Sequence, residues 1–293
     1  MPPKTPHTVT LYDTTLRDGT QAEDISFSVE DKVRIARALD NLGIHYIEGG
    51  WPGSNPRDVE FFKAMQKERL FASRLVAFGS TRKPGIRTKD DRNIQALLSA
   101  RTPAVTIFGK SWKLHVKKAL RVPLEENLEI IFDSVSYLKK RVDIVFYDAE
   151  HFFDGYREDP AYAISTLKAA EKAGADCLVF CDTNGGTLPF DVAGIVGDVR
   201  EKVTKPLGIH AHNDSGTAVA STLMAVREGA THVQGTINGF GERCGNADLC
   251  GVIPALKFKM DINCLPPSRI RKLRETSRFV YELANLPHHK HQP

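Results

Sequence analysis

Residues 8–50 read TVTLYDTTLRDGTQAEDISFSVEDKVRIARALDNLGIHYIEGG, the pattern of a strand, a helix and a second strand. Apolar residues recur every three or four positions over 28–42, which predicts an amphipathic helix. Ser28 stands three residues before Asp31, as in a helix-capping box, and Gly43 is placed to end the helix. The segment therefore predicts one β–α–β unit of a parallel sheet.

The same alternation of short apolar runs and helical runs continues along most of the chain. We expect eight strands, at Thr8–Tyr12, His45–Glu48, Leu75–Phe78, Ala104–Phe108, Asp143–Tyr147, Cys177–Cys181, Leu207–Ala211 and His232–Thr236. The helices after these strands are expected at Ser28–Leu42, Pro56–Lys67, Asp90–Ala100, Pro123–Lys140, Pro160–Ala173, Pro189–Val203, Thr217–Glu228 and Asn246–Met260. Eight such units predict the α/β class and a closed TIM (β/α)8 barrel, since the dinucleotide-binding glycine motif of an open sheet is absent after the first strand.

The predicted barrel takes up residues 1–262 of the 293. Two prolines, Pro266 and Pro267, interrupt the chain soon after the barrel, and residues 267–286 are expected to form one further helix. We expect residues 263–293 to be a short C-terminal helical extension and the start of a truncated linker subdomain.

Composition excludes several classes of protein. Forty Lys and Arg stand against 36 Asp and Glu, and this mild excess includes no aromatic-interleaved basic stripe for nucleic-acid binding. No apolar run is long enough to cross a bilayer, and the first residues show no secretion signal, so we expect no membrane partner. The odd number of cysteines, without a CxxC pair, predicts free thiols in a reducing cytoplasm.

Chemically capable side chains collect where the predicted strands end, which is where barrels of this type carry active sites. The collection comprises Arg17, Asp18, Gln21, Glu48, Tyr147, Asp148, Glu150, His151, Asp182, Thr183, Asn184, His210, His212, Asn213, Asp214, Asn238, Glu242, Arg243 and Asn246. The other ends of the strands show no comparable collection.

The sharpest local signal is the pair His210 and His212. Side chains two apart in a strand share a face, so both imidazoles can point into the barrel mouth. With Asp18 they form a donor set for a divalent metal such as Mn, Mg, Zn or Co, and Asn246 can add a weaker oxygen directly or through water. A pair of core or hydrogen-bonding histidines remains the alternative interpretation.

Each neighbouring residue also has a functional and a structural interpretation. Arg17 can stabilise negative charge on a substrate oxygen, or form a salt bridge. Glu48 and Glu150 are either salt-bridge partners or groups that orient substrate. The hydroxyl of Thr183 can hold a substrate carboxylate or cap its loop. We expect Arg17, Gln21, Glu48 and Thr183 to contact substrate, and Arg17 and Glu150 to be catalytic.

Several longer stretches resemble a known family. They are LYDTTLRDGTQAEDISFSVEDKVRIARALDNLGIHYIEGGWPGSNPRD (11–58), FYDAEHFFDGY (146–156), CDTNGGTLP (181–189), HAHNDSGTAVA (210–220) and GTINGFGERCGNADL (235–249). Together they resemble the DRE-TIM metallolyases, a superfamily that includes 2-isopropylmalate, homocitrate and citramalate synthases and hydroxymethylglutaryl-CoA lyase. The motifs are specific, cover nearly the whole chain, and look most like those of the citramalate synthases.

The resemblance implies a Claisen-type condensation of acetyl-CoA with pyruvate to give citramalate and CoA. It implies metal ligation by Asp18, His210 and His212, with Asn246 at a fourth, weaker position. Other 2-oxo acids, as used by 2-isopropylmalate and homocitrate synthases, remain alternative acceptors. So do an acyl-CoA lyase or aldolase reaction on the same metal and, outside enzymes, a catalytically silent binding barrel.

The resemblance also implies roles for three further residues. Arg17 matches the catalytic arginine beside the bound ketone, Glu150 the glutamate near the acetyl group, and Thr183 the residue that holds the 2-oxo acid carboxylate. Family members are homodimers and continue well past residue 293, into a linker that supplies a histidine and a tyrosine to the neighbouring active site. We therefore expect this chain to be a fragment that binds metal and 2-oxo acid but condenses poorly and lacks feedback inhibition.

Overall fold

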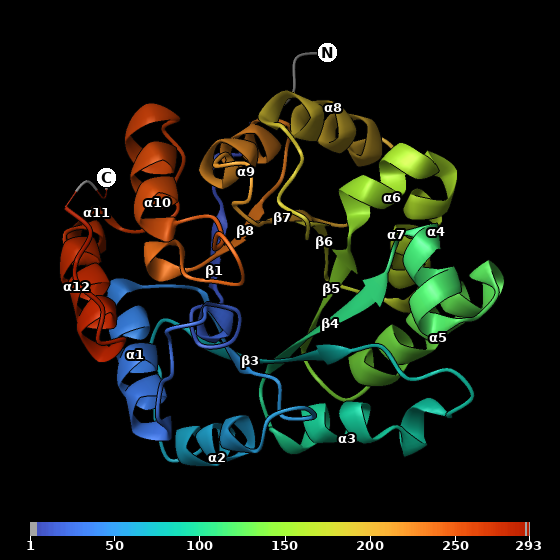
Figure 1. Cartoon of the computed structure of the whole chain (residues 1–293), viewed down its shortest axis with the longest axis horizontal. Helices are drawn as coiled ribbons and strands as arrows, with labels where there is room; N and C mark the ends of the chain where they lie inside the picture. Colours follow the sequence, from blue (N-terminus) through green and yellow to red (C-terminus); the bar gives the residue numbers. More distant parts are fainter. Residues whose placement is uncertain (1–4, 291, 293) are drawn as a thin grey trace.

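Short runs of β-branched and apolar residues form eight parallel strands that close into a barrel. The computed structural model describes residues 5–290 and 292, and its strands neighbour one another in sequence order, with the last beside the first (Figure 1). They are β1 (Thr10–Asp13), β2 (Tyr46–Gly50), β3 (Arg74–Ser80), β4 (Ala104–Lys110), β5 (Ile144–Glu150), β6 (Cys177–Asp182), β7 (Leu207–Ala211) and β8 (His232–Gly235). The predicted TIM barrel is confirmed.

A ring of helices surrounds the strands (Figure 1). The α-helices are α1 (Val29–Leu42), α2 (Pro56–Met65), α3 (Arg92–Ser99), α4 (Lys113–His115), α5 (Leu124–Lys139), α6 (Phe152–Glu158), α7 (Pro160–Ala173), α8 (Pro189–Arg200), α9 (Ala218–Arg227), α10 (Leu249–Lys259), α11 (Pro267–Ile270) and α12 (Leu273–Leu283). Shorter helical turns are η1 (Gly19–Gln21), η2 (Thr88–Asp90), η3 (Val116–Leu120) and η4 (Ile237–Gly239).

The caps of α1 match the sequence signals. The Ser28 hydroxyl accepts a hydrogen bond from the Asp31 backbone N–H, and the Asp31 carboxylate accepts one from the Ser28 backbone N–H. Gly43 ends the helix with a φ of 96°, a left-handed conformation that glycine adopts without strain. The predicted capping box is therefore confirmed.

Two expected helices differ from the structure. The last barrel helix begins at Leu249 rather than Asn246, because Asn246 is extended and pairs with His212 in a β-bridge. The expected single helix over 267–286 is two helices, α11 and α12. The chain turns between them, where the Lys272 ammonium binds the Asn41 side chain of α1. Both lie outside the ring against α1 (Figure 1).

The barrel has two apolar layers. Outside the strands, a continuous core of Leu, Ile, Val, Phe and Ala side chains joins the sheet to the helices. Inside, a smaller cluster includes Tyr12, Phe146, Val179 and Cys181. His232 also lies inside and stacks on Phe146 with ring centroids 4.8 Å apart. The interior is thus filled by side chains, and the inward residues nearer the strand ends can form a site above this floor.

The expectations for the cysteines and for membrane-spanning helices can be compared with the described residues. All five cysteines are present as free thiols, as predicted, and only Cys244 is exposed. Over residues 5–290 and 292, no helix combines the length and apolar character needed to cross a membrane.

His232 makes stability depend on pH. Burial lowers its pKa from 6.5 to about 3, so the folded protein keeps it neutral while the unfolded chain protonates it below pH 6.5. Its stabilising contribution is present above pH 6.5 and is lost as the pH falls toward 3, by about 2 kcal/mol between pH 7 and pH 5. Urea unfolding at both pH values measures the effect. His232→Gln should make the dependence shallower, and an equally steep dependence in the variant would contradict this assignment.

Candidate active site

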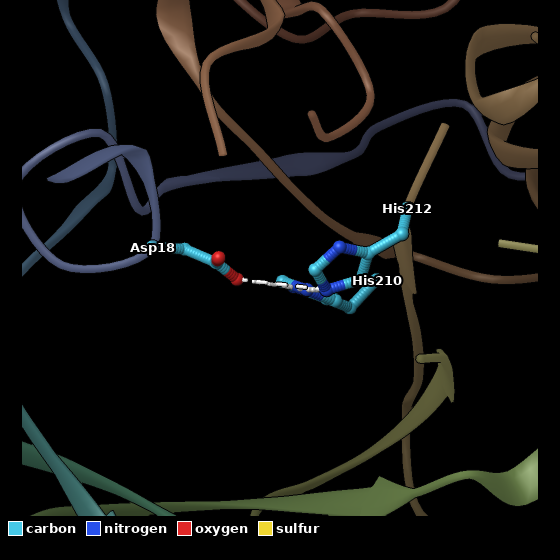
Figure 2. A group of neighbouring side chains, drawn as sticks. All are labelled: Asp18, His210 and His212. Atoms are coloured by element: carbon cyan, nitrogen blue, oxygen red, sulfur yellow. Dashed lines mark hydrogen bonds and ion pairs between the residues drawn. The ribbon is translucent and has the colours of Figure 1, made fainter. Parts of the chain in front are cut away.

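Strand β7 presents two imidazoles to the same point. His210 and His212 are both buried, and their Nε2 atoms lie 3.3 Å apart. The carboxylate of Asp18 comes from the turn after β1, and Figure 2 shows it reaching toward the two rings. Its Oδ2 lies 3.3 Å from Nε2 of His210 and 3.8 Å from Nε2 of His212. The structure thus brings together the three side chains that sequence proposed as metal ligands.

The turn after β1 is built to hold Asp18 at this point. The backbone N–H of Asp18 donates to the Thr14 hydroxyl, and the Arg17 guanidinium lies 3.2 Å from Oδ2 of Asp18. Burial alone would raise the pKa of Asp18, but the Arg17 charge and the hydrogen bond from His210 hold it well below its usual range. The carboxylate is therefore ionised at neutral pH.

The donor set fits a divalent cation. Burial lowers the pKa of His212 to about 4, so its imidazole is neutral at pH 7 and carries a lone pair. Oδ1 of Asp18 and Oδ1 of Asn246 are buried and have no hydrogen-bond partner among the described residues. Unpaired buried acceptors are costly, and a cation beside them would offset that cost. Two imidazoles and a carboxylate suit Mn, Mg, Zn or Co.

Arg17 is anchored from behind. Its Nε donates to Oε1 of Glu48 at 2.6 Å, and its guanidinium lies 3.9 Å from the centre of the Phe78 ring. Glu48 is fully buried and also accepts from the hydroxyls of Tyr12 and Thr14. Both carboxylate oxygens of Glu48 thus have donors in the protein. The structure places Glu48 behind Arg17 rather than in the cavity.

A cavity of about 160 Å³ opens beside the ligand group. Its walls are Arg17, Asp18, Gln21, Trp51, Phe78, Phe108, Asp148, Glu150, Cys181, Thr183, His210, His212 and Glu242. Of the residues given a metal, substrate or catalytic role from sequence, only Glu48 and Asn246 are missing from this wall. Asn246 lines a separate hollow. A larger open groove of about 920 Å³ between the β3–α3 loop and α5 carries none of these residues.

Glu150 and Thr183 each have a protein partner at the cavity rim. The Glu150 carboxylate forms an ion pair with Lys110, the last residue of β4. The Thr183 hydroxyl accepts from the backbone N–H of His151, and the Thr183 carbonyl accepts from Arg243. Gln21 accepts from the Arg17 guanidinium at 3.3 Å. These contacts fix where the side chains stand, while their roles toward substrate remain predictions.

Sequence did not predict the aromatic wall of the cavity. The rings of Trp51, Phe78 and Phe108 have centroids 5.5–5.7 Å apart, and the Trp51 indole N–H donates to Asn93. Trp51 comes directly after β2, as Arg17 comes after β1, so its place at a strand end was the available signal. Asp148, noted among the strand-end residues, also lines the wall.

The model of the family described as HMGL-like matches residues 8–280 of the chain. The chain belongs to this family. The (R)-citramalate synthase of Geobacter sulfurreducens is 64% identical over 97% of this chain and 54% of that protein. The homocitrate synthase AksA of Methanopyrus kandleri is 37% identical over 96% of this chain and 67% of that protein. The family resemblance seen in the sequence motifs is therefore confirmed.

A solved structure has the same fold. The HMG-CoA lyase of Bacillus subtilis superposes with a TM-score of 0.80 at 22% identity, over 98% of this chain and 96% of that one. This chain spans about half the length of the curated (R)-citramalate synthases that it matches. The fold and the family are thus established on independent grounds.

His212→Ala should abolish tight zinc binding while the barrel stays folded. Removing one of three protein ligands is expected to lower zinc affinity by more than the roughly 10–100-fold that follows the loss of a residue hydrogen-bonded to a ligand. Calorimetric titration with zinc measures the affinity, and circular dichroism checks the fold. His7→Gln, at an exposed histidine, is the control and should bind like the parent protein. Unchanged zinc affinity in His212→Ala would remove His212 from the ligand set.

Proposed function

We propose that this chain carries the catalytic site for a metal-dependent condensation of acetyl-CoA with a 2-oxo acid, with pyruvate as the favoured acceptor and citramalate and CoA as products. The observation that carries the proposal is the group of Asp18, His210 and His212 in a small cavity beside Arg17. The high identity to proteins named (R)-citramalate synthase supports it. It also favours pyruvate over the longer acceptors of the homocitrate and 2-isopropylmalate synthases.

Asp18, His210 and His212 would hold the metal, with Asn246 as a fourth, weaker donor directly or through water. When bound, a divalent metal supplies a Lewis acid that polarises the ketone of a 2-oxo acid. We propose Mn, Mg, Zn or Co without choosing among them, because this donor set suits all four.

Arg17 would act on the oxygen that gains negative charge when the new carbon–carbon bond forms. Its guanidinium is held by Glu48 and faces the cavity, so it needs no reorganisation at that moment. The Thr183 hydroxyl would hold the acceptor carboxylate, and Gln21 would help to orient Arg17 and the substrate. Glu48 contributes by positioning Arg17, since its own oxygens have protein donors.

Glu150 would act on the acetyl group. Its carboxylate lines the cavity beside Lys110, where it can take a proton from the acetyl methyl group or orient the base that does. The methyl carbon would then bond to the ketone carbon, and water would cleave the thioester to release CoA.

We also propose that residues 263–293 belong to a linker subdomain distinct from the barrel over 1–262. The protein would act as a homodimer in the cytoplasm.

The substrate panel that tests this function uses metal-loaded protein, acetyl-CoA and one of pyruvate, 2-oxoisovalerate or 2-oxoglutarate. CoA release, measured by chromatography, should be fastest with pyruvate and yield a product with the mass of citramalate. Arg17→Ala should lower it by about 10²–10³-fold, the usual effect of losing one donor to a developing oxyanion.

Each other outcome of the panel supports a different function. Fastest release with a longer acid would favour a 2-isopropylmalate or homocitrate type of synthase. Cleavage of citramalate or of an acyl-CoA without any condensation would favour a lyase or aldolase. Absence of metal binding together with absence of turnover would favour a silent binding barrel.

Trp51 should limit the size of the acceptor, because its ring closes the apolar side of a cavity of only about 160 Å³. Trp51→Ala is expected to raise turnover of 2-oxoisovalerate relative to pyruvate by about 10-fold or more, within the range that small changes in apolar fit produce. Trp112→Ala changes the other tryptophan, which does not line the cavity, and serves as the control. An unchanged ratio in Trp51→Ala would exclude Trp51 from acceptor selection.

A further inference from the structure

Gln234 lies directly beneath the ligand group. It belongs to β8, is fully buried, and pairs in register with His210 of β7. Its Oε1 lies 3.0 Å from Nδ1 of His210, the ring nitrogen that faces away from the other ligands. Its Nε2 lies 3.2 Å from Oδ1 of Asp148 and 3.5 Å from Nε2 of His232. One amide therefore joins a cavity carboxyl, an interior imidazole and a ligand imidazole.

A chain of hydrogen bonds fixes which end of the amide faces His210. The Thr10 hydroxyl donates to the carbonyl oxygen of Thr231, so it must accept from Nδ1–H of His232, 3.2 Å away. His232 is neutral, because burial lowers its pKa to about 3. Its Nε2 therefore carries a lone pair and needs a donor. The NH2 group of Gln234 lies within reach and supplies that donor.

Asp148 favours the same orientation of the Gln234 side-chain amide. Its Oδ1 accepts from the Gln234 NH2 group, and an ionised carboxylate has no proton to donate in return. Burial raises the pKa of Asp148 to about 7, but a neutral carboxyl still offers its carbonyl oxygen to an amide N–H. With both amide hydrogens directed at Asp148 and His232, the carbonyl end of Gln234 must face His210.

The amide carbonyl accepts and cannot donate, so His210 must carry its proton on Nδ1. In the neutral ring, Nε2 then holds a lone pair, and Nε2 is the atom that lies near Asp18 and His212. We propose that Gln234, held by Asp148 and His232, is a positioning residue that fixes the tautomer and ring orientation of His210 for metal binding. This inference rests on the proposed metal site.

The first test removes the acceptor. Gln234→Leu should weaken zinc binding by about 10–100-fold, the usual cost of losing the outer partner of a ligand imidazole. The matched control is Asn127→Leu, at a buried amide on α5 whose NH2 group bonds the Lys110 carbonyl and Tyr162. It should bind zinc like the parent. The proposal would be overturned if the zinc affinity of Gln234→Leu stayed within about twofold of the parent value.

The second test restores the acceptor with a different group. Gln234→Glu alone places a second carboxylate beside Asp148, and like charges at this distance in the interior are unfavourable. Adding Asp148→Asn supplies an amide donor to the new carboxylate, which still accepts from His210. Zinc affinity should be low in the single variant and return to at least the parent value in the double variant. Failure of Asp148→Asn to improve on Gln234→Glu would also overturn the proposal.

Nitrogen NMR of the metal-free protein, recorded at a pH where His210 is neutral, separates positioning from simple loss of stability. It reports which ring nitrogen carries the proton, whereas zinc on Nε2 would itself force the proton onto Nδ1. His210 should show Nδ1–H in the parent and in the double variant, and a destabilised fold alone would not change this assignment. A parent with Nε2–H on His210 would contradict the inference while leaving the ligand group testable. Lack of zinc binding by the parent protein would instead overturn both the proposed function and this inference.

Discussion

Atoms that carry lone pairs converge in a buried corner of the barrel mouth, and the rest of the site depends on that convergence. Oδ2 of Asp18 and the Nε2 atoms of His210 and His212 lie 3.3–3.8 Å from one another. Burial lowers the pKa of His210, but its hydrogen bond to Asp18 and the charge of that carboxylate raise it overall, so without a cation a proton lies between the two groups. A cation bound by the three atoms would replace that proton, and each lone pair would then face positive charge.

The barrel makes this arrangement rigid. The two-residue period of β7 turns His210 and His212 to the interior, and the pairing of β7 with β8 sets Gln234 beside His210. On the other side of β8, the turn after β1 carries Asp18 together with Arg17, whose guanidinium is fixed by buried Glu48. The ligands thus come from the ends of two strands, β1 and β7, and the closed sheet sets the separation between those ends.

Features that depend on a residue pattern within one helix or strand could be predicted from the sequence. Features that depend on which elements are neighbours could not. The barrel and the histidine pair depend on period and spacing within one element, so they were predictable. Glu48 was assigned to substrate, yet its oxygens are bonded by Tyr12, Thr14 and Arg17, contacts that require knowing which strands are neighbours. The support of His210 by Gln234 likewise depends on strand register. The break between α11 and α12 lies where Arg269 and Lys272 bind Asn41 of α1, and helical periodicity does not encode such contacts.

The most direct test of the account is an anomalous diffraction map of crystals soaked in zinc. The account predicts one strong peak bonded to a carboxylate oxygen of Asp18 and to Nε2 of His210 and His212, with each bond about 2.0–2.2 Å long. Nδ1 of His210 would then still face Gln234. Absence of a peak there, or a peak bonded to none of the three side chains, would contradict the claim that these residues form a metal site.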